Sequence, residues 1–206
     1  MTAFKKYRLA LKLYREQNHQ DPDHKIAALL YESAYLGNKY AQFLLPFWGL
    51  DYFCNSSQTS LYWYEKSGRG GHPYAQYCHA IKILEKADRD NLDIMEAAIS
   101  QALTWLQEAA ATGGVTAAAF LLNNVYRVGL WGLEVNMVQA DYWLEIAKKN
   151  RNQYDQIRKQ RKANGNTIMP EDWDLKFHRD SLFILNESDL EKWHQYINTQ
   201  MKRRAI

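Results

Sequence analysis

The side chains that could do chemistry in this sequence are few and scattered. His178 lies four residues after Asp174 and two before Asp180, which is the composition of an acid/base pair. No nucleophile stands in a motif beside them, and the sequence holds no phosphate loop, dinucleotide fingerprint or G-x-S-x-G. A hydrolase that uses His178 is therefore the weaker functional alternative, and we predict that the protein is not an enzyme.

The cysteines and histidines do not have the spacing of metal ligands. His79 is next to Cys78 and near Glu85, but no second histidine or cysteine follows it at the third or fourth position. Cys54 is the other cysteine, and two buried reduced thiols are favoured over one disulfide. We therefore expect no metal site and no cofactor.

A frame of large and small residues recurs along the chain, and it predicts the elements that must position any site. The large residues are Leu29, Trp63, Trp105 and Trp143, at spacings of 34, 42 and 38. Small residues follow each of them four positions later, at Ser33, Ser67, Ala109 and Ala147. Glycine follows eight positions later at Gly37, Gly71 and Gly113, and alanine twelve positions later at Ala41, Ala75 and Ala117. A period of this length is typical of helical arrays.

Each position of this frame has a physical role in a pair of helices. Residues four apart lie on one helix face, so a large side chain beside a small one lets a neighbouring helix approach closely. Glycine can adopt the left-handed conformation that ends a helix. The alanine after it allows the next helix to pack tightly after a short turn. The frame therefore predicts an all-α fold of about four helix pairs.

Composition and charge agree with a globular protein. The 206 residues are 47% hydrophobic and 24% charged, with a formal net charge of +3 that by itself indicates no polyanionic partner. The N-terminal sequence lacks the apolar core of a signal peptide, and no stretch is apolar for long enough to span a bilayer. We expect a cytoplasmic protein that binds neither a membrane nor nucleic acid.

Along the chain, apolar periodicity and turn residues predict a series of helices. We expect them at about 2–18, 22–36, 39–53, 57–67, 73–87, 92–112, 115–128 and 136–152. Pro46 should kink or shorten the third. The basic stretch 148–162 either extends the last helix or forms a short one, and its seven basic residues favour a solvated face over contact with nucleic acid. Residues 1–152 form the predicted repeats, and 153–206 a C-terminal cap with a final helix from Ser188.

The pattern over residues 22–150 resembles the Sel-one-like repeats (SLRs), relatives of the tetratricopeptide repeats. Their unit is approximately A-x-x-W-[YL]-x-K-A-A-x-x-G-x-x-x-A-Q. The matching residues are Ser60, Trp63, Tyr64, Lys66, Gly71, Ala75 and Gln76, then Ala102, Trp105, Leu106, Ala109, Ala110, Gly113 and Ala117, then Ala140, Trp143, Leu144 and Ala147. The sequence departs from the pattern at Leu29, where the family has tryptophan.

This resemblance implies a fold and a class of function. It implies a right-handed α/α superhelix, or solenoid, that acts as a non-enzymatic scaffold and binds another protein in its concave groove. Many bacterial members are adaptors, regulators or immunity proteins of secreted toxins. An immunity protein or cognate chaperone of a secreted effector is the sharpest hypothesis, and a signalling or regulatory adaptor is the alternative.

The first helix of each pair would line the groove, so its residues outside the packing frame are the candidates for partner binding. They are Phe4, Tyr7, Tyr40, Phe43, Phe47, Tyr74, Tyr77, Asn123 and Arg127. Rigid aromatic side chains lose little entropy on binding and suit a peptide or helix. Two alternatives stay open: the aromatic side chains pack between repeats, or the apolar stretch 168–185 occupies the groove.

Overall fold

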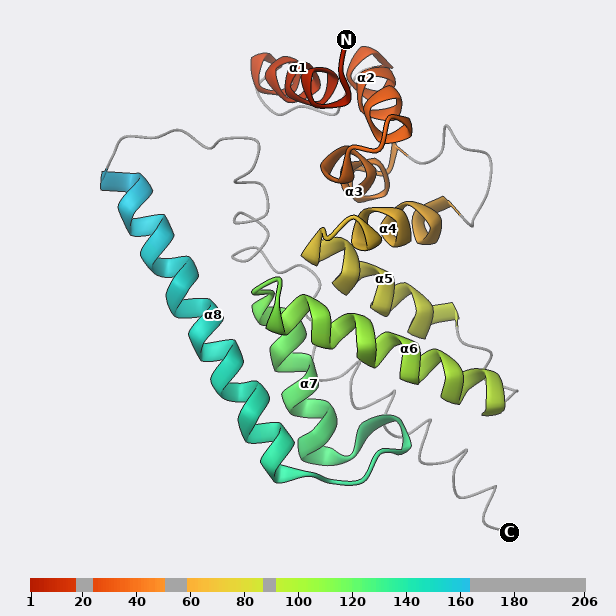
Figure 1. The fold of residues 1–206 in the computed structure, drawn as a ribbon, viewed down its shortest axis with the longest axis vertical. Coiled ribbons are helices and arrows are strands. Elements are labelled where there is room, and N and C mark those ends of the chain that lie inside the picture. The colour runs from red at the N-terminus through yellow and green to blue at the C-terminus, as the bar shows by residue number, and fades with distance from the viewer. Residues whose placement is uncertain (18–23, 51–58, 87–91, 164–206) are drawn as a thin grey trace. The chain divides into compact units, whose positions relative to one another are not determined.

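A computed structural model describes residues 1–17, 24–50, 59–86 and 92–163, and all regular structure in these ranges is helical. The helices are α1 (Ala3–Glu16), α2 (His24–Tyr35), α3 (Lys39–Phe47), α4 (Thr59–Arg69), α5 (Pro73–Lys86), α6 (Leu92–Ala111), α7 (Thr116–Val128), the short 3-10 helix η2 (Leu130–Gly132) and α8 (Met137–Ala163) (Figure 1). Successive helices pack on one another from α1 to α4 and from α6 to α8, in the manner of a helical solenoid. The predicted all-α fold is confirmed.

The chain forms two compact units, Met1–Lys82 and Ile83–Ile206, and α5 runs across the boundary between them. In the first unit α1 packs on α2, α2 on α3, and α3 on α4. In the second unit α6 packs on α7, and α7 on α8. In each unit a helix therefore packs against the helices that come before and after it in the sequence, which is how a repeat array buries its apolar faces.

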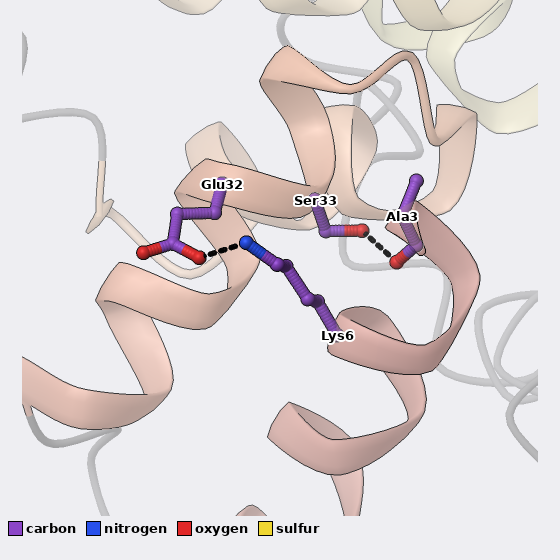
Figure 2. Close-up of polar contacts among 4 residues, drawn as sticks. All are labelled: Ala3, Lys6, Glu32 and Ser33. Carbon is purple, nitrogen blue, oxygen red and sulfur yellow. Dashed lines mark hydrogen bonds and ion pairs between the residues drawn. The ribbon is translucent and has the colours of Figure 1, made fainter. Parts of the chain in front are cut away.

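Two polar contacts join α1 to α2 (Figure 2). The Ser33 hydroxyl donates a hydrogen bond of 2.7 Å to the carbonyl oxygen of Ala3, at the first residue of α1. The Lys6 ammonium forms an ion pair with Glu32. Because Glu32 is largely solvent-exposed, the ion pair contributes little, and the partly buried serine contact is the more specific of the two.

The serine contact is repeated one helix pair later. The Ser67 hydroxyl donates a hydrogen bond of 2.7 Å to the carbonyl oxygen of Lys39, at the first residue of α3. Both serines are completely buried, as the small position of the frame predicts. A buried hydroxyl needs a hydrogen-bond partner, and by donating to a carbonyl of the neighbouring helix it also fixes the distance between the two helices.

A second repeated contact joins one helix pair to the next across the glycine turn. The Gln42 side-chain amide donates to the carbonyl of Ala34 at 3.0 Å, and Gln76 donates to the carbonyl of Gly68 at 3.3 Å. Both glutamines are buried, and each reaches eight residues back into the preceding helix. These bonds occupy carbonyls near the ends of α2 and α4, where helix carbonyls lack intrahelical partners.

The glycine turns follow the predicted frame in two copies and depart from it in the third. Gly37 and Gly71 have positive φ angles of 88° and 78°. In the third copy the residue with positive φ is Gly114, at 69°, and not the predicted Gly113. The buried alanine that follows is accordingly Ala118, whereas the predicted Ala117 is only half-buried. The frame was therefore one residue early here, because two adjacent glycines leave the position of the turn to the packing of α7.

Pro46 shortens α3 as predicted. The helix ends at Phe47, one residue after the proline, and not near residue 53. The Trp48 N–H donates to the carbonyl of Leu44, and Gly49 follows with a φ of 65°. Proline removes one backbone hydrogen bond and its ring crowds the preceding turn, so it is poorly tolerated inside a helix, and α3 ends one residue after it.

The stripe of large residues is buried unevenly. Trp63 and Trp143 are buried, while Leu29 and Trp105 are half-buried. The small residues four positions later, Ser33, Ser67, Ala109 and Ala147, are all fully buried. The small positions therefore mark the closest helix approaches more consistently than the large ones.

In the second unit two buried asparagines form hydrogen bonds that join α8 to α7 and to α6. The Asn123 amide of α7 donates to the carbonyl of Ala140 at 2.8 Å, and the Asn150 amide of α8 donates to the carbonyl of Ala110 at 3.0 Å. Helix α8 continues without interruption from Met137 to Ala163, so the basic stretch 148–162 extends it. The predicted cap beyond residue 163 lies outside the described residues.

Candidate functional site

The structure brings five of the predicted partner-binding residues into one aromatic cluster in the first unit. We define the aromatic cluster as Tyr7, Tyr40, Phe43, Phe47, His72 and Tyr74. The Tyr7 and Tyr40 rings stack with centroids 5.8 Å apart, and the Tyr40 ring meets His72 edge-on at 5.5 Å. Phe43 stacks on His72 at 4.4 Å and on Phe47 at 5.4 Å. The cluster thus links α1, α3 and the start of α5.

Most of the predicted residues in this cluster are buried by the chain itself. Tyr7, Phe43 and Tyr74 are buried, as is the predicted residue Tyr77 outside the cluster, so these side chains belong to the packing between helices. Their burial explains why the aromatic residues recur on α1, α3 and α5: each pair of rings in contact contributes about 0.5–1.5 kcal/mol beyond its buried area.

Three predicted residues form an accessible edge of the cluster, which we call the aromatic rim: Phe4, Tyr40 and Phe47. Phe4 is 41% exposed, and Tyr40 and Phe47 are half-buried. The rim is flanked by cations, since the Arg8 guanidinium lies 5.9 Å from the centre of the Phe4 ring and the Lys39 ammonium 5.3 Å from the centre of the Tyr40 ring. Arginine and lysine placed over aromatic rings in this way are attracted to the ring face.

Helix α1 adds further positive charge beside the rim. It carries five basic residues and one acidic residue, Glu16. The Lys39 ammonium also donates to the carbonyl of Gly71 at 3.2 Å, which holds it near Tyr40. The rim therefore combines accessible aromatic surface with the two neighbouring cations Arg8 and Lys39, whereas Lys6 and Lys12 of α1 pair with Glu32 and Glu16.

The two predicted residues of the second unit have different environments. Asn123 is buried, and its amide is used in the contact between α7 and α8. Arg127 is exposed, and its guanidinium donates to the Asn124 side chain at 3.0 Å. Arg127 is therefore available to a partner, whereas Asn123 positions the two helices.

A second exposed aromatic group was missed by the sequence analysis, and we call it the tyrosine patch: Tyr31, Tyr35 and Tyr62. The Tyr31 and Tyr35 hydroxyls lie 3.0 Å apart, and both rings meet the buried Trp63 edge-on. Tyr35 is 65% exposed, and the Lys66 ammonium lies 4.7 Å from the centre of the Tyr62 ring. The signal was the pair of tyrosines four residues apart, which places both on one face of α2.

The buried titratable groups are explained by packing. Burial lowers the pKa of His79 from its ordinary value, and the nearby Glu65 partly opposes this shift. Burial also raises the pKa of Tyr77. Cys78 is buried, whereas Cys54 lies outside the described residues, so the preference for two reduced thiols over a disulfide stays a prediction.

The sequence analysis also considered metal ligands, membrane-spanning helices and an acid/base pair at His178, and the described ranges bear on the first two. Within these ranges no group of three or more histidine, cysteine, aspartate or glutamate residues is placed to hold a metal ion. None of the helices described here combines the length and apolarity needed to cross a membrane. The possible acid/base pair of His178 with Asp174 or Asp180 lies outside the described residues.

Comparison with known proteins gives weak structural likeness and no match in sequence. No family model matches the chain, and no curated protein matches it in sequence. A solved structure of a protective antigen present in uropathogenic Escherichia coli strains, described as displaying an SLR fold, is similar with a TM-score of 0.37 and 18% identity. The match covers 98% of this chain and 48% of that protein, so this chain spans about half of its length. Likeness at this level does not assign a family.

Proposed function

We propose that the protein is a non-enzymatic helical-repeat scaffold that binds another protein at the aromatic rim. The observation that carries the proposal is that exposed Phe4 and half-buried Tyr40 lie at the edge of a buried aromatic cluster, with Arg8 and Lys39 beside them. The buried rings hold the exposed ones rigid, so little side-chain entropy is lost on binding.

The charge around the rim indicates the chemistry of the partner. With five basic residues on α1 and Lys39 on α3, the rim would attract a segment that carries acidic side chains next to apolar ones. An extended peptide or an amphipathic helix of that composition fits the resemblance to Sel-one-like repeats, whose arrays bind proteins. Binding should weaken as salt concentration rises, because exposed Arg8 and half-buried Lys39 are both reached by solvent ions that screen their charges.

Within this class, the finer role remains our hypothesis. An immunity protein or cognate chaperone of a secreted bacterial effector would hold one partner tightly and in equal amounts. A signalling or regulatory adaptor would bind more weakly and to more than one protein. A hydrolase that depends on His178 is the least favoured alternative, and it predicts turnover that is lost in His178→Ala.

The experiment compares two double variants as bait in extracts of the source organism. Phe4→Ala with Arg8→Glu removes aromatic area and a cation from the rim, and Tyr35→Ala with Tyr62→Ala removes two rings from the tyrosine patch as a matched control. We expect the first variant to lose a protein that the unmodified chain and the control retain in equal amounts. With the purified partner, its Kd should rise by at least about tenfold, or about 1.4 kcal/mol.

Circular dichroism must show unchanged helicity in both variants. Retention of the partner by the rim variant would refute the rim as the binding surface. If only the tyrosine-patch variant loses the partner, the binding surface lies on α2 and α4 instead of at the rim.

A further inference from the structure

Helix α8 packs through one stripe of side chains that runs along most of its length. Ala140, Trp143, Ala147 and Asn150 are buried, and Tyr154, one turn beyond Asn150, is half-buried. Because these residues are three or four positions apart, all five lie on the same side of the helix. The opposite side of α8 therefore points away from these packing contacts.

The opposite side carries large apolar side chains near the start of the helix. Val138 is 80% exposed, and Tyr142, four positions later, is 52% exposed. Val135 and Met137 lie just ahead of them in the chain and are 61% and 51% exposed. We call these four residues the α8 apolar patch. Apolar side chains that gather on a surface in this way are typical of a site that another molecule covers.

The charged residues of α8 separate into two halves. Asp141 and Glu145 are exposed close to the α8 apolar patch, and the stretch 134–147 contains no lysine or arginine. The stretch 148–162 has seven basic residues and one acidic residue, and Lys149 is one of its exposed cations. A molecule that covers the patch should therefore bring positive charge to it.

The two halves of α8 complement each other when two copies of the helix lie antiparallel. Two-fold symmetry then places the acidic half of each helix against the basic half of the other, so every contact occurs twice. If the helices cross at the level of residue 147, Glu145 of one copy lies opposite Lys149 of the other, because each is two residues from that level. A parallel pair would place like charges together along the whole helix.

Glu145 can take part in such a contact although it already has a partner in its own helix. Its carboxylate pairs with the Lys148 ammonium at 2.6 Å, and its side chain is 70% exposed. An ionised carboxylate has two oxygens with about four acceptor sites. A second cation can therefore bind beside Lys148.

We propose that the protein forms an antiparallel homodimer through the exposed side of α8, in which the basic half of one copy covers the α8 apolar patch of the other. The aliphatic stems of Lys149 and Lys159, both exposed, can lie on apolar side chains while their ammonium groups pair with the acidic residues near the patch. A contact one helix wide is small, so we expect a Kd of roughly 10–100 µM at low salt. Residues of the second unit alone form this contact, so it is independent of partner binding at the aromatic rim.

Sedimentation velocity of the unmodified full chain, measured across that range of concentrations, tests for the dimer. We expect the dimer fraction to rise with protein concentration and to fall as salt is raised from about 50 to 500 mM, because exposed charges are screened. Asp141→Lys with Glu145→Lys makes both halves of the helix positive and should raise the Kd by at least about tenfold. Glu96→Lys with Glu108→Lys makes the same charge change at exposed positions of α6 and should dimerise like the unmodified chain.

A second variant tests the apolar part of the contact. Val138→Ser with Tyr142→Ser leaves the net charge unchanged and should raise the Kd by at least about fivefold, because it removes apolar area that the partner helix covers. Circular dichroism must show unchanged helicity in every variant.

Zero-length carbodiimide cross-linking of the unmodified chain locates the contact without any substitution, because it joins lysine and carboxylate groups only when they touch. In a mixture of isotope-labelled and unlabelled protein, we expect links between the two kinds of chain that join Asp141 or Glu145 to Lys149 or Lys159. Links from Glu145 to Lys148 within one chain are expected in any case, because these two residues already pair.

Each of three results would overturn the proposal. The first is a chain that stays monomeric at every concentration and at low salt. The second is an equal rise in Kd for the α6 control and the α8 charge variant. The third is a set of links between chains in which the acidic and basic halves of α8 are not joined.

Discussion

The imidazole ring of His72 lies on the phenyl ring of Phe43, with ring centroids 4.4 Å apart and planes 19° apart. The same imidazole caps the next helix, since its Nδ1 accepts a hydrogen bond of 3.2 Å from the backbone N–H of Ala75. At the equivalent turn one pair earlier, Asn38 accepts from the N–H of Ala41 at 2.9 Å. His72 therefore combines the capping role of Asn38 with an aromatic contact to α3.

Two substitutions separate these roles. His72→Asn keeps a capping acceptor and loses the ring contact, whereas His72→Phe keeps a ring and loses the cap. We expect the lost aromatic contact to cost about 0.5–1.5 kcal/mol and the lost cap about 0.5–2 kcal/mol. His72→Ala should cost more than either single change, as measured by urea unfolding at pH 7.5. If all three variants are as stable as the unmodified chain, His72 has neither role.

The buried serines test the repeated contact between the two helices of a pair. Ser67→Ala removes the hydrogen bond to the carbonyl of Lys39, and we expect a loss of about 1–2 kcal/mol in the free energy of unfolding. Ser67→Leu should be worse, because a fully buried small position cannot accept a larger side chain without moving a helix. Ser100→Ala, at an exposed position of α6, is the control and should change stability by less than about 0.5 kcal/mol.

The adjacent glycines of the third turn give a matched pair. Gly114 has a φ of 69°, so Gly114→Ala should destabilise the protein by about 1–2 kcal/mol. Gly113 is not among the residues with positive φ, and Gly113→Ala should be tolerated. Thermal unfolding of both variants checks the assignment. If Gly113→Ala is instead the more destabilising substitution, the residue with positive φ is Gly113, as the sequence frame predicted.

His79 makes stability depend on pH. Because burial holds its pKa below about 6.5 in the folded chain, the unfolded chain binds a proton first as the pH falls. Stability should therefore decrease as the pH falls from about 6.5 through the folded pKa, with a slope of at most about 1.4 kcal/mol per pH unit from this group. Urea unfolding from pH 7.5 to 5.0 should give a flatter curve for His79→Gln. Parallel curves for the two proteins would exclude this contribution.

The sequence by itself determined the helices and the positions of closest approach between them. Ser33, Ser67, Ala109 and Ala147 were identified from spacing alone, and all four are fully buried. Helix periodicity, glycine turns and the effect of Pro46 are local properties, because they depend on residues within one or two turns of each other. Such properties can be deduced before the helices are packed.

The outcome of ring packing could not be deduced in that way. Spacing selected Tyr40, Phe43, Tyr74 and Tyr77 together, because all of them flank the alanines of the frame. Only the packed helices distinguish half-buried Tyr40 from the other three, which are buried. The depth of a ring depends on side chains from helices far away in sequence, such as Tyr7 and His72 beside Tyr40.

The same reason explains the turn at Gly114 and the extent of α8. Local rules allow either glycine to take a positive φ, and the packing of α7 selects one. The stretch 148–162 was compatible with an extended or a separate helix, and the structure continues it from α8 to Ala163. The sequence thus determined which residues can meet, whereas the tertiary structure decided which do, because burial is a sum over contacts that local spacing does not contain.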